Sequence, residues 1–380
     1  MTAVEIVICL ILLFMVVPDL CQKWGRPALT YSTFVLFGLL LNPLVDVPTA
    51  DMLIQAGKVG FLLLLFEVGL EIDLPKMHEF LRSARFALGW SLVQYPVVFL
   101  LSITAGLGVK ESVLAASALV ACSVGMSHPG WKHYGGVSGK SKHFVLQVMV
   151  ALEVLAVLFL SLETATIEKG LSWVILFKLF GIATVIWLVS QFASHLVRLF
   201  QTILSKATDW RVHLVVLLVL VVCAIGDRLG LSAPKTAFFL GLFMSKIRHE
   251  GMELEDYIAP ISKRFLIPVF FVALGLQIHW QMIFSFTTVF AISAAFLLLG
   301  LREILHKRWF KTGGDRQTYL LFCPNLTIVA LAASFLLGKS ETMQGATWLL
   351  LAGLFMTVTS VLMLPKSKFE KLSKKIDSSV

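Results

Sequence analysis

The sequence predicts an all-α polytopic membrane protein that crosses the bilayer about thirteen times. Its 380 residues are 58% hydrophobic and only 14% charged, whereas a soluble domain carries roughly 25% charged residues. The apolar residues fall in runs close to the roughly twenty residues that a helix needs to cross the hydrocarbon core. Because lipid offers the backbone no hydrogen-bond partners, these runs must be helices.

The predicted spans are separated in many places by Gly, Pro and charged residues. They cover residues 3–20, 28–44, 52–72, 86–107, 112–128, 143–162, 171–195, 212–227, 231–246, 265–280, 284–305, 317–338 and 343–364. Together they predict a single membrane domain over residues 1–365, followed by a basic tail at 366–380. The spans also divide into two units of six around one central helix. Such units lie in opposite orientations, as in the inverted repeats of many secondary transporters.

The loop charges predict the orientation of the chain. When the spans are alternated from an outside N-terminus, Lys and Arg gather in the loops of the inner side and in the tail. The outer loops hold only Lys110, Lys169, Arg228 and Lys339. The positive-inside rule therefore predicts an outside N-terminus and a cytoplasmic C-terminus in a cell (inner) membrane. The net charge of +9 is then a property of the inner loops, and we expect no nucleic-acid partner.

The cysteines do not predict a metal centre or a disulfide framework. No two of them have the spacing of metal ligands, and they are Cys9, Cys21, Cys122, Cys223 and Cys323. We therefore expect no metal and no cofactor. The spans also lack the paired Asp, Ser/His or His-Glu-x-x-His sets that an intramembrane protease needs, so the sequence does not predict an enzyme.

Glu153 is the strongest single indication of function. It lies in an apolar run, 144–160, whose only other polar residue is Gln147. Ten residues beyond His143, at 1.5 Å per residue, it lies about 15 Å deep, near the middle of the bilayer. A carboxylate there is costly unless it is protonated, paired or solvated in a cavity. Such a group can alternate between holding a proton and holding a cation, although a protonated structural glutamate is an alternative.

Two spans contain residues that break helices. Residues 121–130 combine small residues with Pro129 and Gly130, and residues 323–327 place Pro324 before an amide and a hydroxyl. These are the fifth and twelfth spans, the fifth helix of each six-helix unit. Unwound backbone at this depth is tolerated beside protein or a water-filled cavity, and half-helix ends and freed carbonyls hold ions in transporters. We therefore predict a site at mid-membrane, with ordinary proline kinks as the alternative. Its expected members besides Glu153 are Ser123, Ser127, Asn325 and Thr327.

Two further charged residues lie in or near the spans. Arg302 is near the inner end of the eleventh span and stays charged at any relevant pH, so we expect it to be a charge partner of Glu153 or a plain helix-end residue. Glu67 lies about one turn inside the third span, where it either lines an entrance or meets a basic loop residue.

Several segments resemble the membrane domain of the cation:proton antiporter superfamily, the Na⁺/H⁺ and K⁺/H⁺ exchanger-like proteins, without a C-terminal regulatory domain. Residues 64–71 look like the family's LLF-x-x-GLE segment, and residues 121–125 look like its crossover helix. Residues 231–242 resemble its small-residue helix, and residues 270–275 match FF-x-x-x-G. Glu153 takes the place of the family's ion-binding Asp, while Leu152 replaces the polar residue that usually precedes it.

The resemblance implies exchange of a monovalent cation, Na⁺ or K⁺, for protons by a homodimer in a lipid bilayer. It implies a scaffold and dimer bundle at 1–83 and 211–281, a linker helix within 164–210, and a transport core at 84–163 and 282–365. Arg302 falls close to the family's membrane-embedded Lys or Arg. The alternatives are transport of another solute on the same scaffold and a non-transporting sensor.

Overall fold

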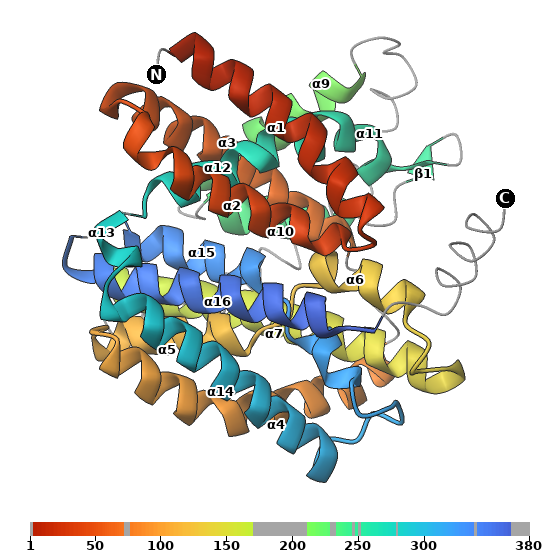
Figure 1. The fold of residues 1–380 in the computed structure, drawn as a ribbon. Helices are drawn as coiled ribbons and strands as arrows, with labels where there is room; N and C mark the ends of the chain where they lie inside the picture. Colours follow the sequence, from red (N-terminus) through yellow and green to blue (C-terminus); the bar gives the residue numbers. More distant parts are fainter. Residues whose placement is uncertain are drawn as a thin grey trace, which may run out of the picture. The chain divides into compact units, whose positions relative to one another are not determined.

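The computed structural model of the chain describes residues 3–71, 77–169, 211–228, 233–244, 248–249, 252–278, 280–337 and 340–365. Nearly all of its regular structure is helical. The helices are α1 (Ala3–Lys23), η1 (Pro27–Leu29), α2 (Thr30–Leu41), η2 (Asn42–Leu44), α3 (Val47–Glu71), α4 (Met77–Thr104), α5 (Val109–Val120), α6 (Val124–His133), α7 (Gly139–Lys169), α9 (Arg211–Arg228), α10 (Ala233–Met244), α11 (Leu254–Ile261), η3 (Ser262–Leu266), α12 (Ile267–Leu276), α13 (Trp280–Ile283), α14 (Phe286–Arg308), η4 (Thr318–Phe322), α15 (Leu326–Leu337), η5 (Ser340–Thr342) and α16 (Met343–Met363). The strands β1 (Arg248–His249) and β2 (Met252–Glu253) form one short antiparallel pair. Figure 1 shows the ribbon.

The predicted spans agree with these helices wherever the structure describes the chain. Every predicted span except 171–195, which lies outside the described residues, coincides with a continuous or broken helix. Nine helical segments among the described residues are long and apolar enough to cross a membrane. The predicted tail, 366–380, and most of the linker segment, 164–210, also lie outside the described residues.

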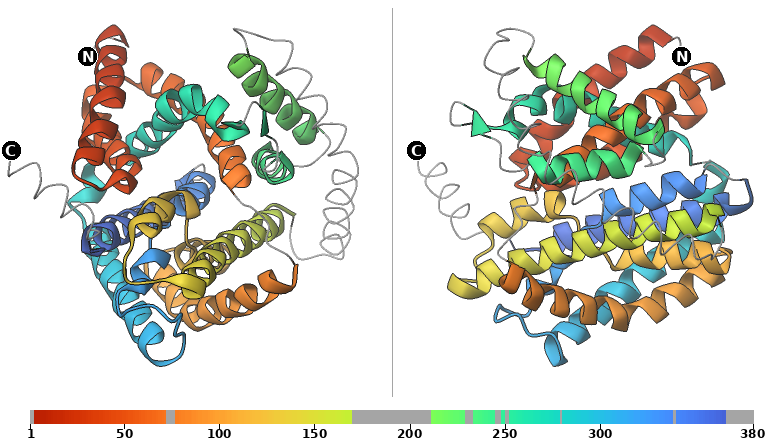
Figure 2. Two further views of the ribbon diagram at one scale, coloured as in Figure 1. Left: turned by 90° about the vertical axis from the view of Figure 1, so that its right-hand side faces the viewer. Right: turned by 180° about the vertical axis from the view of Figure 1, so that it is seen from behind.

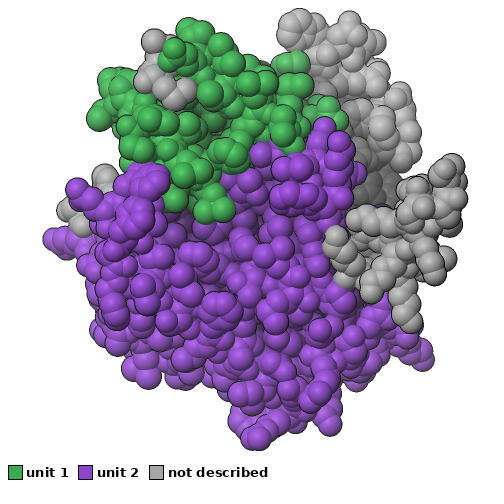
Figure 3. Space-filling view, in the orientation of Figure 1, with its two compact units in different colours: residues 1–16, 34–74, 168–277 green, residues 17–33, 75–167, 278–380 purple. Residues whose placement is uncertain are grey.

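The chain divides into two compact units, coloured separately in Figure 3. The first comprises residues 1–16, 34–74 and 168–277, and the second comprises 17–33, 75–167 and 278–380. The sequence-based scaffold bundle, 1–83 and 211–281, also included residues 17–33, 75–83 and 278–281, which the structure groups with the second unit. Residues 17–33 are the longest of these segments. In the structure, η1 packs against α6 and α16, and the Arg26 guanidinium donates a hydrogen bond to the Leu362 carbonyl at 3.2 Å. These contacts place the segment in the second unit.

The first unit is built around α3, which packs against α10 and α12. Glycines allow the helices to touch through their backbones. A Cβ added to Gly241 would lie 2.0 Å from the Phe66 carbonyl oxygen, and one added to Gly60 would lie 1.9 Å from that of Leu266. Without a hydrophobic driving force between helices in lipid, such close approach supplies much of the packing energy.

Gly60→Ala should therefore destabilise the protein. The added methyl group would meet backbone atoms of η3, which cannot rotate away, and overpacking of this kind costs about 1–3 kcal/mol. The matched control is Gly300→Ala in α14, where an added Cβ has no neighbour within 4 Å and alanine favours the helix by up to about 1 kcal/mol. Thermal unfolding in detergent should show a lower midpoint for the first variant only. Equal midpoints would contradict the close packing.

The second unit is a bundle of long helices. Its helix α14 packs on α16, α16 on α15, α15 on α5, and α5 on α4. Figures 1 and 2 show this bundle, with α4 in orange, α7 in yellow and α16 in blue. The bundle holds the two interrupted helices and the buried charges described next.

Candidate ion-binding site

Two helices of the second unit are interrupted where the sequence predicted breaks. Between α5 and α6 the backbone is extended at Ala121 and Ser123. Between η4 and α15, residues 323–325 leave the helix. Pro324 has no N–H to continue a helical ladder, and its ring disfavours helical backbone in the residue before it. The two breaks expose backbone groups that continuous helices would have paired.

The two breaks contact each other directly. The backbone N–H of Ser123 donates a 2.7 Å hydrogen bond to the carbonyl oxygen of Pro324. The Cys122 thiol donates to the carbonyl of Leu321 at 3.4 Å. The predicted crossing of two broken helices is therefore confirmed, and both interruptions lie within the predicted segments 121–130 and 323–327.

Glu153 projects from α7 to this crossing and is fully buried. Its Oε2 accepts a hydrogen bond from the backbone N–H of Val124 at 2.9 Å. Val124 is the first residue of α6, and the first N–H groups of a helix have no intrahelical partner and carry partial positive charge. The end of α6 therefore stabilises the ionised carboxylate at the crossing.

Three more oxygen atoms at the crossing are buried. They are the hydroxyl oxygens of Ser123 and Thr327 and the side-chain oxygen of Asn325, and each lacks a hydrogen-bond partner among the residues that the structure describes. The Asn325 amide nitrogen is occupied, because it donates to the Leu119 carbonyl at 3.0 Å. A buried polar atom without a partner costs about 1–3 kcal/mol and is rare enough to need a specific explanation. Oxygen atoms that replace a hydration shell are the ligands that alkali cations take in channels and transporters.

Arg302 on α14 is fully buried and contacts the residues that precede both breaks. Its Nη2 donates to the Leu119 carbonyl at 2.7 Å and its Nη1 donates to the Phe322 carbonyl at 2.9 Å. These carbonyls belong to the last turn of α5 and to the last residue of η4. Carbonyls at helix C-termini carry partial negative charge, so one guanidinium stabilises both interrupted ends. The third donor, Nε, bonds to Oε1 of Gln94 at 2.7 Å.

The two charged side chains at the crossing thus face helix ends of opposite polarity. A fixed cation, Arg302, faces the C-terminal ends of α5 and η4, and a carboxylate, Glu153, faces the N-terminal end of α6. The three donors of Arg302 are directed to neutral oxygens. Arg302 therefore holds the two breaks together through these bonds, and the predicted partnership with Glu153 stays a prediction.

A cavity of about 570 Å³ in the second unit reaches the crossing. Ser127 and Pro324 form part of its wall, and Arg26 and Gln22 lie in the wall as well. Ser127 is buried in the first turns of α6, and its hydroxyl lies 3.4 Å from the Cys122 sulfur. Water and ions therefore have a route to the edge of the crossing.

Comparison with known proteins decides the family. Residues 9–367 match the family described as "Sodium/hydrogen exchanger, transmembrane". The chain belongs to this sodium/hydrogen exchanger family.

Individual relatives agree with this assignment. The exchanger is 27% identical to the Na⁺/H⁺ antiporter of Enterococcus hirae over 292 aligned residues. The alignment covers 72% of this chain and 73% of the relative. It is 25% identical to the Na⁺/H⁺–K⁺ antiporter GerN of Bacillus cereus over 280 aligned residues, and this alignment covers 69% of this chain and 68% of the relative. The solved structure of the sodium proton antiporter MjNhaP1 from Methanocaldococcus jannaschii has a TM-score of 0.68, covers 95% of each chain, and is 14% identical.

These findings confirm the predicted fold class and its general activity. The exchanger is an all-α polytopic membrane protein with the antiporter fold of inverted repeats and crossing broken helices. It is a transporter of the cation/proton exchanger class and not an enzyme. The identity of the cation is addressed under Proposed function.

Glu67 of the exchanger belongs to the first unit, whereas the residues of the crossing belong to the second. It is buried on α3 and accepts a hydrogen bond from the Ser262 hydroxyl. Ser262 opens the π-helical turn η3, a kind of turn that occurs often at functional sites. The structure therefore gives Glu67 a contact within the unit, between α3 and η3.

Two residues of the exchanger's site were missed by sequence reasoning. Gln94 holds the Nε of Arg302, and the Thr357 hydroxyl accepts from the backbone N–H of Asn325 at 3.2 Å. Gln94 is one of few polar residues in the apolar part of α4, which could have singled it out. Thr357 gives no such indication, because a threonine in a membrane helix usually bonds to its own backbone.

Proposed function

We propose that this exchanger moves a monovalent cation, Na⁺ or K⁺, against protons, and that Glu153 holds either ion. The observation that carries the proposal is the crossing itself: a buried carboxylate beside three buried oxygens that lack partners among the described residues. The names of the relatives support both cations, since one is a Na⁺/H⁺ antiporter and another a Na⁺/H⁺–K⁺ antiporter.

The proposed mechanism is competition at one carboxylate. When the Glu153 carboxyl group releases its proton to water, the carboxylate becomes a ligand for a dehydrated cation. The oxygens of Ser123, Asn325 and Thr327 complete the coordination, with Ser127 nearer the cavity. Because the site holds a proton or a cation but not both, each cation carried one way is matched by one proton carried the other way. One-for-one exchange moves no net charge.

Arg302 has a fixed role in this mechanism. It stays protonated at any relevant pH, so it carries no second proton as a lysine would. Its bonds to the ends of α5 and η4 keep the interrupted backbone in place when the site is empty.

The orientation and assembly of the exchanger are part of the proposal. We place the cavity that contains Arg26 on the cytoplasmic side of a cell (inner) membrane, with the N-terminus outside and the C-terminus inside. Cysteine labelling that found residues 311–316 and the tail on opposite faces would reject this orientation. We also propose a homodimer formed through the scaffold bundle, and a monomer in native membranes, seen by crosslinking, would reject it.

A cation screen tests the activity. When Na⁺ or K⁺ is added outside proteoliposomes that contain the purified exchanger and a trapped pH dye, the lumen should become more alkaline, because cations enter in exchange for luminal protons. A cation that the site binds weakly should give a slower rise in luminal pH. Li⁺, Na⁺, K⁺ and Rb⁺ are compared at equal concentration and at clamped zero potential. An imposed potential should leave the rate unchanged, because the exchange is one for one. Absence of flux with every cation would favour the non-transporting sensor or another solute.

A further inference from the structure

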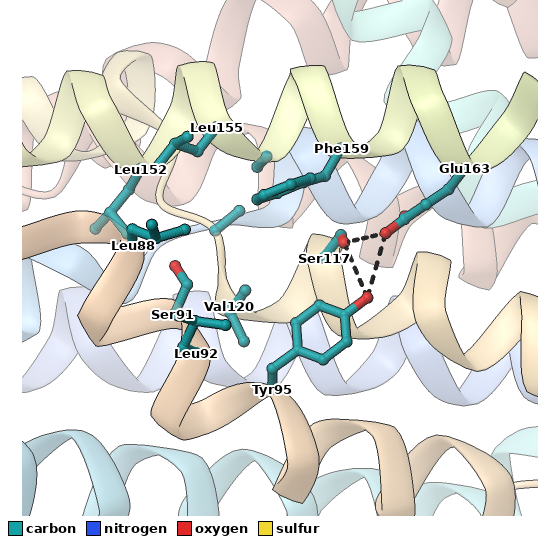
Figure 4. Close-up of a pocket in the computed structure, with 12 residues that line it drawn as sticks. Leu88, Ser91, Leu92, Tyr95, Ser117, Val120, Leu152, Leu155, Phe159 and Glu163 are labelled. Carbon is teal, nitrogen blue, oxygen red and sulfur yellow. Dashed lines mark hydrogen bonds between the residues drawn. The ribbon is translucent and has the colours of Figure 1, made fainter. Parts of the chain in front are cut away.

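A second pocket in the second unit lies away from the cavity that leads to the crossing. It has a volume of about 270 Å³ and is formed between α4, α5 and α7. Figure 4 shows its lining side chains, with α7 on one side and α4 on the other. None of the residues assigned to the ion site lines it. It therefore needs an explanation of its own.

One end of the pocket is polar. The Ser117 hydroxyl donates to Oε1 of Glu163 at 2.7 Å, and the Tyr95 hydroxyl lies 3.2 Å from the same oxygen. Tyr95 is also within 2.9 Å of the Val113 carbonyl. In Figure 4 these three side chains converge from three helices. The two hydroxyls thus fix the position of the Glu163 carboxyl group in the pocket.

The other oxygen of Glu163 is available to a ligand. Its Oε2 is buried and has no hydrogen-bond partner among the described residues. A carboxylate oxygen in such a place is costly, and the cost is removed by a cationic donor. An ammonium group offers three N–H donors and no acceptor, and its bond to a carboxylate is stronger than a bond between neutral groups.

The rest of the pocket is apolar. Its walls include Leu88 and Leu92 of α4 and Leu152, Leu155 and Phe159 of α7. From Leu152 to Glu163 the pocket follows α7 for about 16 Å, at 1.5 Å per residue. Leu92 is 60% exposed, and Leu88 and Phe159 are 39% and 38% exposed. The pocket therefore reaches the apolar surface of the unit, and a molecule dissolved in the bilayer can enter it.

We propose that this pocket binds a monocationic amphiphilic amine, with its ammonium group on Glu163 and its alkyl or aryl body along α4 and α7. The combination of one buried carboxylate oxygen, two orienting hydroxyls and an apolar channel open to lipid is complementary to that class of molecule. An anionic lipid headgroup does not match it, because its phosphate would lie against the Glu163 carboxylate. Val120 and Ala121 at the end of α5 also line the pocket, but the proposal does not depend on the exchange mechanism, since none of the residues assigned to the ion site is among the lining residues.

Binding of n-octylammonium to the exchanger in lipid nanodiscs tests the proposal. Radiolabelled amine is titrated, and the signal of empty nanodiscs is subtracted to remove partitioning into lipid. We expect saturable binding that n-octanol, which has the same chain and no charge, displaces at least about tenfold more weakly. Glu163→Gln should weaken the amine's affinity by at least about tenfold, a difference of about 1.4 kcal/mol.

The matched control is Glu111→Gln. Glu111 lies in the first turn of α5, in the same unit and outside the pocket, so its loss should change the affinity less than twofold. Ala156→Leu provides a second variant, because Ala156 lines the pocket and the larger side chain fills it while Glu163 stays. It should also lower the affinity at least about tenfold.

The outcomes separate the alternatives. Equal displacement by n-octanol and n-octylammonium would show a cavity for uncharged chains and overturn the proposal. Wild-type affinity in Glu163→Gln, or no saturable binding above empty nanodiscs, would overturn it as well. Should Glu163→Gln fail to fold, Ala156→Leu decides the question, and unchanged affinity in that variant would reject the pocket as the site.

Discussion

Glu153→Gln is expected to abolish cation-driven proton movement while the protein still folds. Glutamine has the same shape, and its amide oxygen can accept the hydrogen bond that Val124 N–H now gives to Oε2. The amide does not titrate near neutral pH and carries no negative charge, so it can neither release a proton nor attract a cation. Cation-induced flux in proteoliposomes should therefore fall to the level of empty vesicles.

The controls for this variant test charge and position separately. Glu303→Gln makes the same change on α14, where Glu303 is half-exposed and paired with Lys307, and it should keep wild-type exchange. Glu153→Asp keeps the charge but shortens the side chain, so it should retain slower exchange. Wild-type flux in Glu153→Gln would rule out Glu153 as the shared site.

Arg302→Met should have the second largest effect, on both stability and transport. The change removes the donors to the Leu119 and Phe322 carbonyls and to Gln94. The Leu119 carbonyl keeps the hydrogen bond from the Asn325 amide, whereas the Phe322 carbonyl and Gln94 lose the guanidinium donor. Each buried acceptor left without a partner costs about 1–3 kcal/mol, so the unfolding midpoint should fall by several degrees. Transport should be lost, because the guanidinium would no longer bond to both the end of α5 and the end of η4 and hold the two breaks together.

Arg308→Met is the matched control for Arg302→Met. Arg308 is at the exposed end of the same helix, and loss of an exposed charge usually changes stability by less than about 0.5 kcal/mol. Arg302→Lys should be intermediate, since a lysine ammonium lacks the planar fork of guanidinium donors. An Arg302→Met variant with wild-type stability and flux would show that the guanidinium has no part in the crossing.

Much of the architecture could be predicted because its signals are local. Runs of apolar residues and their length define the spans, as for Phe286–Arg308. Pro324 and the small residues around Ser123 mark the breaks, because their effect on the backbone depends on the residue itself and its direct neighbour. Glu153 stands out because it lies in an apolar run, 144–160, whose only other polar residue is Gln147. These features need no knowledge of which helix lies beside which.

The remaining features depend on contacts between distant segments. Gln94 and Arg302 are 208 residues apart in sequence, and no periodicity brings them together. Residues 17–33 group with the second unit through contacts with α6 and α16, which a division by consecutive spans cannot show. Glu163 looks like an ordinary residue near the end of α7, and only the fold places Ser117 and Tyr95 against it.

The central claim is that proton and cation compete for Glu153, and the pH dependence of the apparent KM for the cation tests it most directly. Exchange is measured in proteoliposomes at fixed internal pH while the external pH and cation concentration are varied on the same side. Competition predicts that KM rises about tenfold for each pH unit below the pKa of the site, while the maximal rate at saturating cation is unchanged. Glu153→Asp should move the pH at which the rise begins, and Glu303→Gln should not. A KM that is independent of pH, with a maximal rate that falls with acidity, would contradict the claim, because the proton would then act at a site that the cation does not share.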